Sequence, residues 1–101
     1  MEKKDLRFKI ESYMDGNELV FSFGFVGYSK DNDDFFEKIS KEFGYEGCDD
    51  IITKCCEKIA DVADKEINTK ITDKELHSVE FLNYILNLNG RIMTLQDIED
   101  L

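Results

Sequence analysis

The stretch LVFSFGFVGY, residues 19–28, decides how this chain folds. Phe21, Phe23 and Phe25 recur at every second residue, so on a β-strand they lie on one face of the sheet. Aromatic and β-branched side chains also favour strands over helices. The stretch therefore predicts a strand whose aromatic face has to be covered by other elements.

A second alternating stretch precedes it, at residues 6–14. Its even-numbered positions are mostly apolar and its odd-numbered positions mostly charged, which is typical of a half-buried strand. The tripeptide Asp15-Gly16-Asn17 stands between the two stretches and is a strong hairpin signal. We therefore expect an antiparallel β-hairpin with strands at about 5–14 and 18–28.

The loop of this hairpin determines which residues face one another. A two-residue Asp15-Gly16 loop places Ile10 opposite Phe21. A Gly16-Asn17 loop shifts every pair by two residues but keeps the same faces together. A three-residue loop would set the phenylalanines against the charged face of the first strand, which excludes it. Either remaining loop predicts that the aromatic row belongs to the core.

Three helices are expected after the hairpin, at about 32–43, 49–67 and 73–89, followed by a short helix at about 95–101. Each segment repeats apolar residues at helical spacing. We expect Asp31 or Asn32 to cap the first helix and Thr94 to cap the last. The expected buried positions of the first two helices are Phe35, Phe36, Ile39 and Phe43, and then Ile52, Cys55, Cys56, Ile59, Val62 and Ala63.

The third helix has a candidate capping box, in which Thr72 and Glu75 each bond to the other's backbone. Ile71 and Leu76 stand at the flanking positions of a hydrophobic staple. Together these patterns predict one α+β domain over residues 1–101, a hairpin packed by three helices and a short C-terminal helix.

Composition restricts the functional classes. The chain has no apolar run long enough to span a membrane and no secretory signal pattern, and its three cysteines are typical of a reducing cytoplasm. The net charge is −10, and residues 31–66 hold twelve acids and five bases. Direct binding to a nucleic-acid backbone is therefore not expected, because it depends on clustered lysines and arginines.

Two known binding motifs, one for RNA and one for calcium, are only partly matched by this sequence. Residues 23–28 match the second part of the RNA-recognition octamer, whose aromatic side chains stack on bases. Phe21 and Ser22 stand where that octamer has its basic residue and its first glycine. The aspartates from Asp31 onward lack the glycine that a calcium loop needs at its sixth position, where this chain has Phe36. We interpret the phenylalanines as core and the aspartates as helix-start residues.

The soft metal ligands of the chain are Cys48, Cys55, Cys56 and His77. They match no zinc spacing, because there is no Cys-x-x-Cys and no pair of histidines. Adjacent cysteines on a helix diverge by about 100° and do not chelate one ion readily. We therefore expect no metal, no cofactor and no catalytic group, so that the protein is not an enzyme.

The remaining signal is an acidic segment that follows the aromatic strand. As a solvated helix surface it would only aid solubility. As a functional surface it would attract a basic partner, with tyrosines as anchors. The partner-binding residues of this hypothesis are Asp31, Asp33, Asp34, Glu37, Glu42, Glu46, Asp49 and Asp50, together with Tyr28 and Tyr45.

We therefore expect a small cytoplasmic protein that inhibits or modulates a basic, nucleic-acid-handling protein or nucleoprotein complex by mimicking nucleic acid. Anti-CRISPR proteins of phages and mobile elements, and immunity proteins of nuclease toxins, act in this general way. The alternative is a self-associating assembly module without catalytic activity, such as a homodimer. It is suggested by the surplus apolar side chains Phe81, Tyr84 and Leu88 and by the hairpin's unpaired edges.

Overall fold

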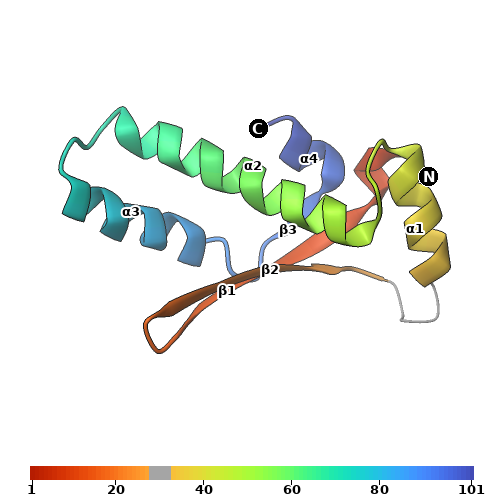
Figure 1. Cartoon of the computed structure of the whole chain (residues 1–101), viewed down its shortest axis with the longest axis horizontal. Helices are drawn as coiled ribbons and strands as arrows, with labels where there is room; N and C mark the ends of the chain where they lie inside the picture. Colours follow the sequence, from red (N-terminus) through yellow and green to blue (C-terminus); the bar gives the residue numbers. More distant parts are fainter. Residues whose placement is uncertain (28–32) are drawn as a thin grey trace.

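The structure is a computed structural model that describes residues 1–27 and 33–101 (Figure 1). A long helix, α2, lies across one face of a small antiparallel sheet, and α3 runs back along α2 above the hairpin turn. The helix α1 and the N-terminus lie at the opposite end of the molecule. In chain order the elements are η1 (Lys3–Asp5), β1 (Arg7–Asp15), β2 (Glu18–Phe25), α1 (Asp33–Glu42), α2 (Cys48–Asn68), α3 (Lys74–Leu86), β3 (Ile92–Thr94) and α4 (Leu95–Glu99).

The predicted α+β class, the N-terminal hairpin and the helices are thus confirmed, with ends that differ by a few residues. The predicted cap at Asp31 or Asn32 lies outside the described residues. Within the described ranges, no helix is both long enough and apolar enough to cross a membrane.

The register of the hairpin follows from its turn. Phe8 faces Phe25 and Ile10 faces Phe23, while Asp15 pairs with Glu18. The two-residue loop is therefore Gly16-Asn17 and not Asp15-Gly16. Gly16 has a φ of 62°, a left-handed value that a glycine adopts without strain.

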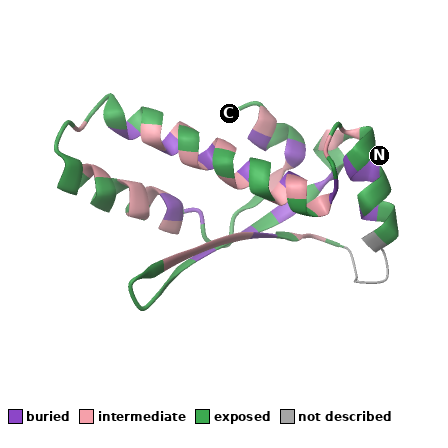
Figure 2. Ribbon diagram, in the orientation of Figure 1, coloured by how far each residue is buried: buried purple, intermediate pink, exposed green. Residues whose placement is uncertain are grey.

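The aromatic face of the hairpin forms the floor of the core, as predicted. Leu6, Phe8 and Ile10 are fully buried, and Phe23 is nearly so (Figure 2). The ring of Phe25 stacks on that of Phe36, with 4.8 Å between the centroids, and so joins β2 to α1. Stacking on RNA bases is not open to Phe23, because its side chain is used inside the molecule.

The buried side of α2 differs from the predicted stripe. Ile51 and Ile67 are buried although neither was expected, whereas Ile52, Cys56 and Val62 are only half-buried. The reason is that α2 packs against β2, α3 and α4 at different points along its length, so its buried side turns along the helix. In α1, Phe35 is also an exception, because it is 48% exposed instead of buried.

The predicted capping box of α3 is wrong. Asp73 caps the helix instead, because its Oδ1 accepts hydrogen bonds from the backbone N–H groups of Glu75 and Leu76. Leu76 is 56% exposed, so the expected hydrophobic staple does not form. An aspartate one residue after a threonine competes for the same cap, and its carboxylate also benefits from the positive end of the helix dipole.

The far end of α3 is fixed by β1. The hydroxyl of Ser12 is buried and donates a hydrogen bond of 2.8 Å to the carbonyl of Ile85, in the last turn of the helix. The backbone N–H of Ser12 donates to Oδ1 of Asn89, at 2.9 Å. These bonds satisfy polar groups that the core would otherwise leave unpaired.

The strand β3 was not predicted. Its three residues pair with β1, and the sheet order is β2-β1-β3. The helix α4 begins directly after β3. Thr94 caps this helix, as predicted, and Asp97 completes a capping box. Because β3 occupies the second edge of β1, β2 keeps one edge without a strand neighbour among the described residues.

Candidate acidic surface

The predicted partner-binding acids come together at the end of the molecule that holds α1 (Figure 1). Tyr28 and Asp31 lie outside the described residues, and Asp33 is the first residue of α1. The others follow on α1, on the connection to α2 and in the first turn of α2. Of these, Asp34, Glu37, Glu42, Glu46 and Asp49 are exposed, and Asp50 is half-buried.

Glu37 helps to hold the fold. Gly47 stands at the N-cap of α2 and has no side chain that could cap the helix. Glu37, on α1, reaches across so that its Oε1 accepts a hydrogen bond from the backbone N–H of Cys48, at 3.4 Å. A Cβ on Gly47 would collide with the carboxylate of Glu37, so the glycine provides the space for this contact. The start of α2 is therefore capped from another helix.

Asp50 also has a structural role. Its Oδ2 accepts a hydrogen bond of 2.9 Å from the backbone N–H of Glu46 and lies 3.2 Å from the Nζ of Lys54. The bond from the Glu46 backbone is the main reason why the pKa of Asp50 is lowered, and Lys54 adds to the effect. These contacts close the connection between α1 and α2.

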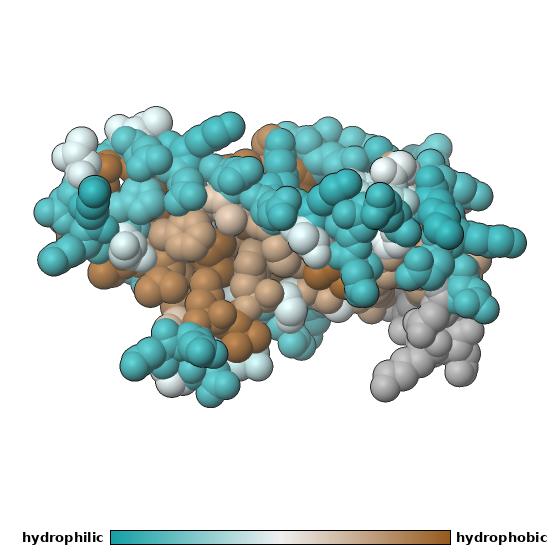
Figure 3. Space-filling view, viewed as in Figure 1, coloured by the Kyte–Doolittle hydropathy of each residue, from teal (hydrophilic) through white to brown (hydrophobic). Residues whose placement is uncertain are grey.

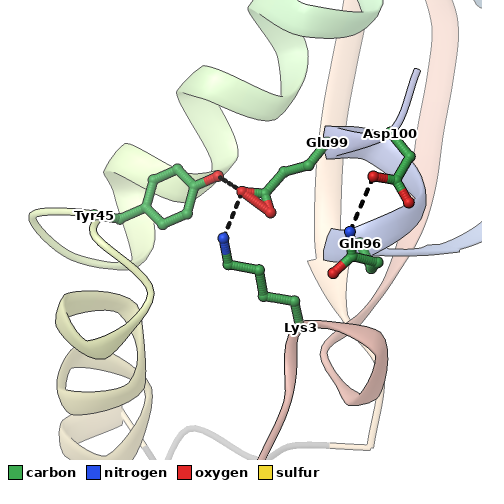
Figure 4. A network of polar contacts seen from close by, with 5 residues as sticks. All are labelled: Lys3, Tyr45, Gln96, Glu99 and Asp100. Atoms are coloured by element: carbon green, nitrogen blue, oxygen red, sulfur yellow. Dashed lines mark hydrogen bonds and ion pairs between the residues drawn. The ribbon is translucent and has the colours of Figure 1, made fainter.

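Tyr45 is part of a polar network with both ends of the chain (Figure 4). Its hydroxyl donates to Oε1 of Glu99, on α4, at 3.2 Å, and the same oxygen lies 2.9 Å from the Nζ of Lys3. The ammonium of Lys54 lies 5.5 Å from the centre of the tyrosine ring. Burial, followed by the charge of Glu99, raises the pKa of Tyr45 to about 12. Tyr45 is thus an internal tie more than an open anchor.

Four acids of this group remain available. Asp34, Glu42, Glu46 and Asp49 are exposed, and within the part of the chain that the structure describes none of their carboxylates forms an ion pair. We call these four residues the acidic end. Lys38 and Lys41, on α1, are exposed among them, so the acidic end is not uniformly negative.

The acidic character continues along α2 beyond the segment that the sequence singles out. Glu57 and Asp61 are exposed and follow Asp49 by eight and twelve residues, which brings all three within about 120° of one another around the helix. From Asp49 to Asp61 this row of acids extends by about 18 Å at 1.5 Å per residue. The i, i+4 spacing was the signal that could have revealed this row from the sequence.

Thiol chemistry is disfavoured by the surroundings of the cysteines in α2. Burial raises the pKa of Cys55 to about 12 and that of Cys56 to about 11, so both are protonated near neutral pH. Among the described residues, no group of three or more His, Cys, Asp or Glu side chains is placed to hold a metal ion.

His77 lines a hollow of about 730 Å³ between the end of α2 and the start of α3. Its Nε2 is 3.7 Å from Oδ1 of Asp64 and has no hydrogen-bond partner within the described ranges. The hydroxyl of Ser78, on the same wall, donates to the carbonyl of Lys74 within α3. The serine is therefore engaged with its own helix and not with the histidine, and the pair offers no activated nucleophile.

Comparison of the chain with protein-family models, with curated proteins and with solved structures finds no match.

Proposed function

We propose that this protein is a small acidic binding protein that inhibits or modulates a basic, nucleic-acid-handling partner by occupying the surface that the partner offers to nucleic acid. The observation that carries this proposal is the exposed acidic end, Asp34, Glu42, Glu46 and Asp49, which forms no ion pair with the residues that the structure describes and is continued along α2 by Glu57 and Asp61. Blocking of this kind needs no chemical turnover.

Electrostatics favours such a partner for two reasons. The net charge of −10 gives the whole chain a long-range attraction to a positive cleft, which raises association rates by about ten- to a thousandfold at low salt. Asp49, Glu57 and Asp61 also place three negative charges along α2, about 12 Å and then about 6 Å apart, which suits a groove lined with arginines and lysines.

An apolar anchor stands beside the acidic end. Phe35 follows Asp34 on α1 and is 48% exposed. Aromatic side chains are enriched at the centre of interfaces, and polar or charged residues surround them at the rim. In this proposal Phe35 takes the role that the sequence suggested for Tyr45, whose hydroxyl is engaged by Glu99.

This proposal implies that the protein acts inside a cell, where basic nucleic-acid enzymes and their complexes are found. Anti-CRISPR proteins of phages or mobile elements and immunity proteins of nuclease toxins are the analogous classes. The analogy rests on size, charge and the lack of a recognisable catalytic motif, and not on a shared sequence motif.

The test is displacement of labelled double-stranded DNA from a panel of basic nucleases and RNA-guided nuclease complexes. We expect the protein to displace DNA from at least one of them, with an affinity that falls about tenfold or more between about 50 mM and 300 mM salt. Reversing three charges, with Asp49→Lys, Glu57→Lys and Asp61→Lys, should abolish the displacement.

The matched control reverses three exposed acids on other elements, with Glu11→Lys on β1 and Glu75→Lys and Glu80→Lys on α3. It changes the net charge by the same amount and should retain most of the affinity. Equal losses in the two triple variants, or displacement that does not depend on salt, would count against a nucleic-acid mimic.

A further inference from the structure

The edge of β2 that faces away from β1 presents backbone groups without a partner among the described residues. The backbone N–H of Val26 donates to the carbonyl of Arg7, at 3.0 Å, which sets the phase of the ladder between the two strands. In an antiparallel pair, hydrogen-bonding positions alternate along each strand. The even-numbered residues of β2 therefore bond to β1, and the N–H and C=O groups of Leu19, Phe21 and Phe23 point away from the sheet.

This edge lacks the features that usually prevent strand pairing. Edge strands are commonly protected by lysines, prolines, bulges or a covering element. Charged residues make up 36% of the chain, yet none occurs at positions 19–27, and the chain has no proline. In a protein with so many charged residues, a strand edge without charges indicates a surface that binds another strand.

Partly buried apolar side chains gather between β2 and the helices. Leu19 and Phe21 of β2, Ile52 and Cys56 of α2 and Phe81 of α3 are only partly buried, and all pack against the core. Figure 3 shows apolar side chains gathered between the hairpin and the helices α2 and α3. A strand added to β2 would place alternate side chains on the same face of the sheet as these residues.

We propose that a second copy of this chain pairs with β2 through its own β2, in antiparallel orientation, to form a continuous six-stranded sheet. The reason for a second copy is self-complementarity, as an isologous interface requires. A two-fold axis perpendicular to the sheet, near Ser22, keeps both phenylalanine rows on the helix-covered face. It sets Phe21 of each copy opposite Phe23 of the other and forms about eight backbone hydrogen bonds.

The charge distribution also favours a second copy at this edge. The strand segments that meet, residues 19–25, contain no charge, so pairing brings no acid against an acid within the sheet. A basic partner would find no complementary charge there. The acidic end lies on α1 and α2 and not on β2, so the dimer and the proposed binding of a basic partner use different elements.

The dependence of affinity on salt distinguishes this inference from the proposed function. Each copy carries −10, so screening the mutual repulsion should strengthen the dimer, whereas binding to a basic partner should weaken with salt. Sedimentation equilibrium of the full chain should show a dimer whose dissociation constant falls severalfold between about 50 mM and 500 mM NaCl. A protein that stays monomeric at about 1 mM in high salt overturns the inference and leaves the proposed function standing.

Two variants test the position of the interface. Ser22 lies opposite Glu11 on β1, so Ser22→Lys adds a favourable cross-strand pair within one copy. Across the two-fold axis it sets two lysines about 4.5 Å apart at their Cα atoms, and dimerisation should weaken about tenfold or more. Tyr13→Lys is the control, because it adds the same charge on the same sheet face of β1, away from the edge, and should dimerise like the original chain.

Amide hydrogen exchange gives an independent readout. The amides of Phe21 and Phe23 should exchange slowly in a concentrated sample, and fast in a dilute one and in Ser22→Lys. Mild oxidation of Ser22→Cys should give a disulfide-linked dimer, while Tyr13→Cys should not exceed the original chain. A dimer in which the Phe21 and Phe23 amides stay unprotected, or one that Ser22→Lys does not weaken, assigns the contact to another surface and overturns the inference.

Discussion

The core side chains of the hairpin and the acids around α1 contribute to the fold through different forces. The hairpin packs through fully buried apolar side chains, such as Phe8 and Ile10, and through one buried hydroxyl at Ser12. The acids around α1 lie near the surface, where Glu37 and Asp50 make polar contacts, although α1 itself packs through the buried ring of Phe36. Apolar burial contributes several kcal/mol per side chain, whereas exposed polar contacts contribute about 1 kcal/mol or less.

This difference shows which part of the molecule can acquire substitutions that favour binding to a partner without loss of stability. Substitutions in the hairpin core affect the whole fold, so that region is restricted to packing. Substitutions at the acidic end have small effects on stability, so its charges are open to selection for binding. A cluster of acids in a sequence is therefore not one functional unit, because Glu37 and Asp50 serve the fold while Asp34 and Asp49 remain available.

The largest effect is expected for Phe23→Ala. Phe23 is 6% exposed and lies edge-on to Phe8, with ring centroids 5.8 Å apart. Its removal leaves a cavity at the centre of the sheet and should lower the free energy of unfolding by about 3–5 kcal/mol in urea denaturation. Phe21→Ala, at a half-buried position of the same row, should cost about half as much in a monomeric sample.

A smaller effect is expected for Ser12→Ala. The substitution removes the buried hydrogen bond from the hydroxyl of Ser12 to the carbonyl of Ile85, which still accepts from the backbone N–H of Leu88. It should lower the free energy of unfolding by about 0.5–1.5 kcal/mol. Ser78→Ala is a suitable control, because the hydroxyl of Ser78 is exposed and bonds only within its own helix. Equal costs in the two variants would contradict the assignment of Ser12 as the tie between β1 and α3.

Much of the hairpin could be predicted from the sequence, because its signals are local. Alternation and a glycine turn fix the faces, and Thr94 starts α4 by contacts within four residues. The strand β3 could not be predicted, since three residues show no usable alternation and their pairing depends on β1.

The abundance of acids around α1 could be predicted from the sequence, but the polar contacts at this end of the molecule could not. The partner of Glu37 lies 11 residues away and that of Lys3 lies 96 residues away, so no spacing rule connects them.

The cap of α3 was missed for another reason. Thr72 and Asp73 are both good capping residues, and only the backbone geometry decides between them.

Near the acidic end, the substitution Tyr45→Phe should have a moderate effect on stability. It removes the hydrogen bond to Glu99 and should lower the free energy of unfolding by about 1 kcal/mol at neutral pH. The pKa of Tyr45 in the fold is about 12 against an ordinary value of 10.0, so the folded state favours the protonated phenol. Its contribution is complete below pH 10 and is lost as the pH rises toward about 12.

The measurement is urea denaturation of both proteins from neutral pH to about pH 11. The original chain should lose stability relative to Tyr45→Phe as the pH rises through this window, because ionised Tyr45 stands beside the negative charge of Glu99. A constant difference between the two proteins over the whole range would mean that Tyr45 is not engaged by Glu99 in solution.

The smallest of these effects is expected for Glu37→Ala. Glu37 is exposed and its bond to the backbone of Cys48 is long, at 3.4 Å, so the loss of this cap should cost about 0.5–1 kcal/mol. Glu42→Ala, on the same helix, removes an exposed acid without a described partner and should cost less than about 0.5 kcal/mol. Both variants remove one negative charge, so any difference between them reports the cap and not the net charge. Equal stability of the two would place Glu37 with the acids that remain available to a partner, and would widen the acidic end by one residue.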